Sequence, residues 1–437
     1  MNSMAMAELS ETLSDFAIST RFDDDALEIM RLSMLDWAAV AIAGQNEPVA
    51  QILRDQAQEE GGAPEAGLVG TALRVPARMA AMVNGTISHA LDYDDTHFAH
   101  IGHPSVAVVP AALATAERVG ASGDDVQQAA LVGVEASIRV GVWLGRGHYQ
   151  TGFHQTATAG AFGATLGAGR LLGLDAAQMR SALGLVATRT SGLKSQFGTM
   201  GKPFNAGLAA SNGVEAAVLT AKGFVSNPSA LEAAQGFGPT HHGAGDLTAL
   251  NGLGQEWLFP TVQHKFHACC HGLHATLEAL AECDAPPDAI AKVQISTHPR
   301  WMTVCNIAQP TTGLKAKFSY AQVVAMRLLG YDTARLDSFT DALTQDPAVI
   351  AMRQKVEVVE DNALSEMQAR VDVTLRTGDV VTLSHDLDTP VPLEARTNRI
   401  KTKATSLLGA SRAEALWDLI DTKAPPRDFA AALVDPA

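Results

Sequence analysis

The sequence is poor in aromatic residues and in cysteine, and its charge is mostly of one sign. Only 5% of the 437 residues are aromatic, so small aliphatic side chains in Ala-rich helices must fill most of the core. The 32 basic and 47 acidic residues give a net charge of −15, which disfavours non-specific binding to nucleic acid or anionic membranes. No Cys-x-x-Cys pair occurs, which argues against a zinc ribbon or a disulfide framework. The four cysteines are Cys269, Cys270, Cys283 and Cys305.

Long apolar runs are also missing. No segment approaches the roughly 18 consecutive apolar residues that a membrane-spanning helix needs. The stretch from Met1 to Arg21 contains three acidic residues and no lysine, unlike the basic start of a signal peptide. We therefore expect a soluble, cytoplasmic protein. With 47% hydrophobic residues, the chain can form a sizeable core, and its length fits two or three domains.

The chain up to about residue 260 predicts helix after helix. Capping residues and stop signals delimit them, as where Asp175 and Gln178 form an N-terminal box. Glycines at three- and four-residue spacing, such as Gly160 and Gly163, favour close helix packing. The expected helices begin at Asp25 (ending at Gly44), at Pro76, at Asp124 (to Leu144), at Asp175 and at Asn205 (to Lys222).

The pattern changes after about residue 280, where alternating apolar residues predict strands. Thr377-Gly378-Asp379 reads as a hairpin turn. The expected strands cover 292–298, 355–359, 369–375 and 380–384, with helices at 319–329 and from Ser411. The fold prediction is therefore mainly α: a large all-α helical domain (1–266 and 395–437), onto which the last helix packs back, and a smaller α+β lid domain (267–394).

Nucleotide-binding signatures do not occur. No Gly-x-Gly-x-x-Gly follows an expected strand, and no Gly-x-x-x-x-Gly-Lys-[Ser/Thr] is present. A nucleotide cofactor therefore has no support in the sequence.

The segment from His89 to His97 is the densest in ionisable groups. Asp92, Asp94 and Asp95 repel one another unless cations or donors lie nearby, and such crowding suits a proton donor or base. The alternative is a purely structural role, namely a solvated acidic turn in which Asp95 caps a helix. His103 follows shortly afterwards. Both interpretations stay open at this point.

Three further residues are candidates by their context. Lysine does not occur before Lys194, and Lys202 and Lys265 both lie beside apolar residues rather than on a charged helix face. His154 directly precedes an Ala/Gly-rich helix, where capping, burial and catalysis are all possible roles.

A metal site is a weaker alternative. His97, His100 and His103 are spaced by three, and His267, His271 and His274 by four and three. However, Pro104 disfavours a helix through the first set, and neither set has a carboxylate partner motif. We expect no metal.

Together, a series of motifs resembles the MmgE/PrpD family, which includes 2-methylcitrate dehydratase, cis-aconitate decarboxylase and iminodisuccinate epimerase. The motifs stand in the family's order and span about residues 10 to 410. They are Asn84-Gly85 and 89–96; Gly102-His103-Pro104-Ser105; Gly133-Val134-Glu135 with Arg139; Gly152-Phe153-His154; Ser191-Gly192-Leu193; Gly198-Thr199-Met200 with Lys202-Pro203; Lys265 with Cys269 and His274; and Ala316-Lys317-Phe318-Ser319.

The resemblance implies an active site in a cleft between a helical domain and an α+β lid, no metal or organic cofactor, and a homodimer. It places six residues around a polycarboxylate substrate, namely Asp92, Thr96, His103, His154, Lys202 and Lys265. The extra histidines His264, His267 and His271 depart from the pattern and leave the substrate's identity open.

The reaction that follows from this resemblance is proton abstraction next to a carboxylate. Lys202 and Lys265 would bind the substrate with Thr96 and stabilise the developing negative charge. His103 or His154 would protonate the leaving hydroxyl, and Asp92 would act as base or orient a histidine. We expect a cofactor-independent hydro-lyase for a small di- or tricarboxylate such as 2-methylcitrate. The alternatives are an epimerase or decarboxylase of a related acid, and a non-catalytic binding protein.

Overall fold

A computed structural model describes residues 8–434. The chain forms two compact units, a larger one comprising 1–264 and 400–437 and a smaller one comprising 265–399. The division into domains at 266 and 395 stays a prediction. The mainly α fold class is confirmed. Among the described residues, no helix is both long enough and apolar enough to span a membrane.

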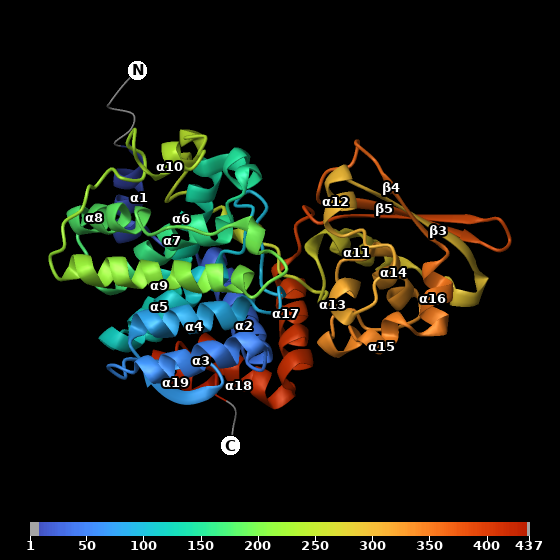
Figure 1. Ribbon diagram of the computed structural model, residues 1–437, viewed down its shortest axis with the longest axis horizontal. Coiled ribbons are helices and arrows are strands. Elements are labelled where there is room, and N and C mark those ends of the chain that lie inside the picture. Colours follow the sequence, from blue (N-terminus) through green and yellow to red (C-terminus); the bar gives the residue numbers. More distant parts are fainter. Residues whose placement is uncertain (1–7, 435–437) are drawn as a thin grey trace. The chain divides into compact units, whose positions relative to one another are not determined.

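The larger unit is helical (Figure 1). Its long helices are α1 (Glu8–Ser19), α2 (Asp24–Gly44), α3 (Pro48–Glu60), α4 (Ala77–His89), α5 (Ser105–Val119), α6 (Gly123–Thr151), α7 (Gln155–Leu171), α8 (Ala176–Ala187) and α9 (Gly201–Ala221). The short helix α10 (Phe237–Thr240), the later helices α18 (Ala410–Asp421) and α19 (Pro426–Ala432), and the small hairpin of β1 (Ala66–Leu68) and β2 (Thr71–Val75) complete it. Helix α18 packs on α2, as predicted for the last long helix.

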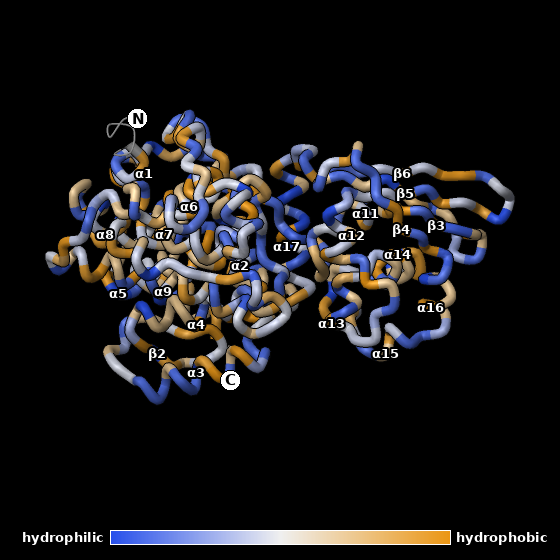
Figure 2. Tube along the Cα trace, turned by 45° about the horizontal axis from the view of Figure 1, so that its top comes forward, coloured by the Kyte–Doolittle hydropathy of each residue, from blue (hydrophilic) through white to orange (hydrophobic). Residues whose placement is uncertain are grey.

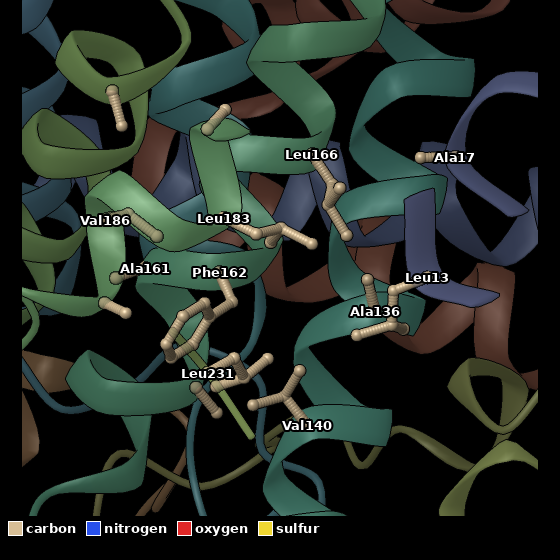
Figure 3. Packing of buried hydrophobic residues seen from close by; sticks show 14 of the residues in the cluster. Leu13, Ala17, Ala136, Val140, Ala161, Phe162, Leu166, Leu183, Val186 and Leu231 are labelled. Atoms are coloured by element: carbon tan, nitrogen blue, oxygen red, sulfur yellow. The ribbon is translucent and has the colours of Figure 1, made fainter. Parts of the chain in front are cut away.

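Helix α7 is central to this unit and packs against α5, α6, α8 and α9. Figure 3 shows Phe162 and Leu166 of α7 among side chains from α1, α6 and α8. Close approach depends on small residues, because a Cβ added at Gly163 would lie 2.3 Å from the Gly133 carbonyl oxygen. The predicted packing role of these glycines is therefore confirmed, and it sets the positions of α7 and α9 within the unit.

Helix starts differ from the sequence predictions by a few residues. Asp23, rather than Asp25, caps α2 by accepting a hydrogen bond from the Ala26 backbone. Asp175 and Gln178 form the predicted capping box of α8. Helix α9 begins at Gly201, several residues before the predicted start. Gly409 rather than Ser411 precedes α18. Neighbouring Asp residues can replace one another as caps, which explains the shift at α2, whereas α9 and α18 begin after Met200 and Gly409 without a side-chain cap.

The smaller unit contains a four-stranded sheet with the order β4–β3–β5–β6. The strands are β3 (Ile290–Thr297), β4 (Val356–Glu360), β5 (Gln368–Leu375) and β6 (Val380–Asp386), so all four predicted strands are confirmed. β3 pairs with β4 in parallel and with β5 in antiparallel fashion. Hydrophobic and hydrophilic residues alternate along β3 and β5 (Figure 2).

Helices accompany this sheet. They are α11 (His274–Ala279), α12 (Pro299–Val304), α13 (Gly313–Ala316), α14 (Tyr320–Leu328), α15 (Asp341–Thr344) and α16 (Pro347–Arg353), and α17 (Leu393–Leu408) contains the second boundary between the units. Helix α11 packs on β5 and β6, and α14 packs on β4 and α16. The burial of alternate residues such as Val293, Val371 and Val373 gives this unit its own core.

Candidate active site

The site starts where helix α4 ends at His89. The chain then turns sharply, and Asp92 adopts a positive φ of 52°, a left-handed conformation that Asp tolerates better than most residues. Lys403 stabilises this turn. Its Nζ donates to the Tyr93 carbonyl oxygen at 2.6 Å and forms an ion pair with Asp36 at 2.6 Å. The turn sends the three neighbouring carboxylates in different directions.

Asp94 points into a buried pair of histidines. Its carboxylate lies 3.0 Å from His89 Nδ1 and 2.8 Å from His103 Nδ1. Burial raises the pKa of Asp94, but the His103 and His89 imidazoles outweigh it and hold that pKa well below its ordinary value. Asp94 is therefore an ionised, fully buried carboxylate that binds two imidazole rings.

Asp92 connects the same histidine to a lysine. Its Oδ1 lies 2.7 Å from Lys202 Nζ and 3.5 Å from His103 Nε2. Lys202 belongs to the first turn of α9, where the following Pro203 is tolerated because the first helical N–H groups have no partner within the helix. It is also paired with a carboxylate. Asp92, Lys202 and His103 thus form one connected group of ionisable side chains.

His154 lies on the other side of this group, at the N-cap of α7. Its Nδ1 is 3.3 Å from the Asn205 side-chain amide, which donates, so the remaining ring proton is assigned to Nε2. Burial, with the positive charges of His89, Lys202 and His103, holds the pKa of His154 well below its ordinary value. At neutral pH His154 is therefore a neutral hydrogen-bond donor rather than an acid.

Phe197 gives the site an apolar wall. Its ring packs edge-on against His154 at 4.9 Å, and Lys202 Nζ lies 5.5 Å from its centroid. Neither Phe197 nor Asn205 was among the predicted site residues. Both lie within a few residues of Lys202 in sequence, which is the only signal that pointed to them.

Asp95 turns away from this group and supports helix α5. Its carboxylate accepts hydrogen bonds from the backbone and hydroxyl of Ser105, the first residue of α5. Asp95 therefore caps the first N–H of α5, but the expected solvated acidic turn is wrong, because Asp94 and Asp95 are buried. Burial raises the pKa of Asp95 to about 7. Thr96, the next residue, pairs its backbone with Gln263 and donates its hydroxyl to the Gln263 carbonyl at 3.4 Å.

By spacing alone, four of these side chains could surround a cation. Ligand atoms of His89, Asp92, Asp94 and His103 all lie within 4.8 Å of one another. Their negative charge, however, already meets Lys202 and two imidazoles, so a divalent ion would have to displace the Lys202 ammonium from Asp92. We assign no metal here.

His97 and His100, the other members of the first histidine series, have structural contacts. His97 Nε2 lies 3.0 Å from the Leu258 carbonyl, and His100 Nε2 lies 3.1 Å from the Ser137 hydroxyl. Burial lowers the pKa of His97 to about 4 and that of His100 to about 3, so both are neutral. The spacing of three residues does not make these histidines one ligand set with His103.

Glu135 and Arg139, part of one of the motifs, are also structural. Both are buried and lie one turn apart on α6, 2.7 Å from each other. Glu135 accepts from the backbone of Leu258 and Phe259. Arg139 donates to three carbonyl oxygens of the segment before them, those of Ala249, Asn251 and Glu256. The segment from Ala249 to Phe259 is irregular, and the Glu135–Arg139 pair binds backbone groups that regular secondary structure would otherwise satisfy.

We expect Arg139→Met to lower the free energy of unfolding by roughly 3–5 kcal/mol, because it leaves a buried carboxylate and three carbonyls without their cation. Urea unfolding followed by circular dichroism measures this. Arg146→Met, at an exposed position just beyond the kink of α6 at Gly145, is the control and should change stability by less than about 0.5 kcal/mol. An equal effect of the two substitutions would contradict the anchoring role.

Lys265 lies in the smaller unit and is buried there. Burial, with the charges of His271, His267 and Lys265, lowers the pKa of His274, whose ring stacks on His271 at 4.7 Å. His267 lies 3.3 Å from Glu278, and burial is outweighed by His267 and Arg399, which lower the pKa of Glu278 to about 2. The participation of Lys265 in the site of the larger unit stays a prediction.

The other extra histidine, His264, belongs to the larger unit. Its Nε2 lies 2.9 Å from the Ser33 hydroxyl of α2, and both side chains are buried. Of the predicted site residues, the larger unit brings together Asp92, His103, His154 and Lys202. His89 and Asp94, which were not among the predicted site residues, lie in the same group.

Comparisons with known proteins agree with these motifs. The MmgE/PrpD N-terminal domain model matches residues 11–249, and the MmgE/PrpD C-terminal domain model matches residues 267–416. Cis-aconitate decarboxylase from Aspergillus terreus is 28% identical over 96% of this chain and 94% of its own. The Homo sapiens cis-aconitate decarboxylase is 26% identical over 80% of this chain and 77% of its own. The mitochondrial 2-methylcitrate dehydratase of Yarrowia lipolytica is 27% identical over 41% of this chain and 38% of its own. The chain therefore belongs to the MmgE/PrpD family.

Proposed function

We propose that this protein is a lyase that acts on a small di- or tricarboxylate through proton transfer at a carbon next to a carboxylate. The observation that carries the proposal is the connected group of Asp92, Lys202 and His103. The Asp92 carboxylate lies 2.7 Å from the Lys202 ammonium and 3.5 Å from the His103 imidazole. Such a set suits acid–base chemistry on an anionic substrate.

In this proposal, Lys202 binds a substrate carboxylate and stabilises the negative charge that develops when the neighbouring carbon loses its proton. Asp92 is the base, and Lys202 shields its charge in the resting site. His103, as imidazolium, donates a proton from Nε2. The neutral His154 donates a hydrogen bond to the substrate from its own Nε2. Lys265 and Thr96 are proposed as further substrate-binding groups.

Two lyase reactions fit these roles. In the first, a citrate-like acid such as 2-methylcitrate loses a proton to Asp92 and a hydroxyl that His103 protonates to water. In the second, an unsaturated tricarboxylate such as cis-aconitate loses CO2 from its CH2 carbon, and His103 protonates the resulting allylic carbanion. The second candidate is favoured by relatives named for that reaction that match 96% and 80% of this chain.

Purified protein should turn over one of these acids without added cofactor. Absorbance of the new C=C bond follows dehydration of 2-methylcitrate or citrate, and release of CO2 follows decarboxylation of cis-aconitate. Turnover of one acid, saturable and lost on heat denaturation, supports the proposal. Failure of the protein to convert any acid in a panel of di- and tricarboxylates would contradict it.

A further inference from the structure

Asp94 differs from Asp92, the other carboxylate of the site, in that its side chain is almost completely buried. Its side chain is 1% exposed, whereas that of Asp92 is 29% exposed. An isolated carboxylate at such a depth would be costly, and its charge is compensated by two rings, those of His89 and His103. A charge buried to this degree acts mainly on the groups it contacts, here the two imidazole rings.

The contact with Asp94 defines which nitrogen of His103 holds a proton. An ionised carboxylate only accepts hydrogen bonds, so the 2.8 Å ion-pair contact between Asp94 and a ring nitrogen is attractive only when that nitrogen carries hydrogen. That nitrogen is Nδ1. Nε2, on the opposite side of the ring, is then the nitrogen that gains or loses a proton, and it lies 3.5 Å from Asp92 Oδ1. The backbone of His103 is also fixed, because its N–H donates to the Thr156 hydroxyl of α7 at 3.0 Å.

We propose that Asp94 is a positioning residue that sets the tautomer and orientation of His103 and supports the imidazolium when Nε2 is protonated. The role of Asp94 in turnover rests on the proposed function. Asp94 keeps its own charge throughout: the proton that reaches the substrate leaves Nε2, and Nδ1 keeps its hydrogen. His103 rather than His154 is then the proton donor, since His154 Nδ1 is bound by the Asn205 amide rather than by a carboxylate and the pKa of His154 is lowered.

His89 is the second arm of this arrangement. Its Nδ1 lies 3.0 Å from both carboxylate oxygens of Asp94, and it ends helix α4, so the carboxylate is tied to a rigid element. Its ring also packs edge-on against that of His103, with centroids 4.6 Å apart. Asp94 is thereby fixed from one side and holds His103 from the other.

Asp94→Asn tests the proposal, because it keeps the shape of the side chain and removes its charge. We expect kcat to fall by roughly 10²–10⁴-fold with little change in KM, as for other carboxylate–histidine pairs. Without the negative charge of Asp94, protonation of His103 becomes less favourable, because the nearby Lys202, His89 and His154 disfavour a further positive charge. The alkaline limb of the kcat profile should therefore move to lower pH. Asp95→Asn is the matched control, with kcat expected within about threefold of wild type.

A second measurement does not depend on activity or on the folding of Asp94→Asn. A long-range ¹H–¹⁵N spectrum of the wild-type protein labelled with ¹⁵N-histidine reports the tautomer of His103, whose signals are identified by their loss in His103→Gln. A proton on Nδ1 supports the proposal, and a neutral ring protonated on Nε2 overturns it. A kcat of Asp94→Asn close to that of wild type, with an unmoved pH profile, also overturns it. Absence of wild-type turnover would refute the proposed function instead and leave the tautomer result to decide the role of Asp94.

Discussion

His103→Gln should lower kcat/KM for the polycarboxylate substrate by roughly 10²–10⁴-fold, the usual contribution of a positioned general acid or base. Glutamine has similar reach and can still donate a hydrogen bond, but it cannot transfer a proton. Because His103 lies between Asp94 and Asp92, its loss removes the proton donor from the centre of the site. Steady-state kinetics at pH 7, with the circular dichroism spectrum as a check of folding, measure this effect.

His97→Gln is the matched control in the same loop. His97 contacts the Leu258 carbonyl and the Thr261 hydroxyl, away from the charged group, so we expect reduced stability and near wild-type kcat in the folded protein. If His103→Gln instead lost stability and retained its kcat, the assignment of His103 as the proton donor would be wrong.

Lys202→Met should reduce kcat/KM by roughly ten- to several-hundred-fold. A charge-assisted contact to a substrate carboxylate contributes on the order of 1.5–3 kcal/mol or more in a partly desolvated site. Loss of the pair with Asp92 should cost stability less than about 1 kcal/mol, because both side chains are partly exposed, at 17% and 29%. Kinetics and urea unfolding of the same preparation separate the two effects.

Lys194→Met provides the comparison for Lys202. Lys194 is also a cation of the larger unit, but its Nζ donates to the Tyr149 carbonyl and lies over the Tyr149 ring. Its removal should leave kcat/KM within about threefold of wild type. Equal losses in the two variants would indicate a general effect of positive charge and would count against a specific substrate contact at Lys202.

Much of the fold could be predicted from the sequence because its signals are local. The box of Asp175 and Gln178 fixes the start of α8, and the alternation of Val371 and Val373 identifies β5. Where two capping residues are close together, as at Asp23 and Asp25, propensity alone does not choose between them.

The candidate site was only partly predictable because its geometry depends on one turn. The dense segment from His89 to Asp95 was recognised, but the positive φ of Asp92 decides which carboxylate faces which partner. Sequence spacing did not separate Asp94, which binds His89 and His103, from Asp95, which caps α5. Likewise, Glu135 and Arg139 fit a family motif, and only the contacts assign them to an anchoring role.

The most direct measurement is a ¹H NMR time course of 2-methylcitrate and of cis-aconitate in D2O, with wild-type protein and with His103→Gln at equal concentration. The account predicts that the wild type converts one of the two acids, either by dehydration or by loss of CO2 with one deuterium incorporated into the product, and that His103→Gln does so at least about a hundredfold more slowly. Conversion at the same rate by both proteins, or by neither, would contradict it.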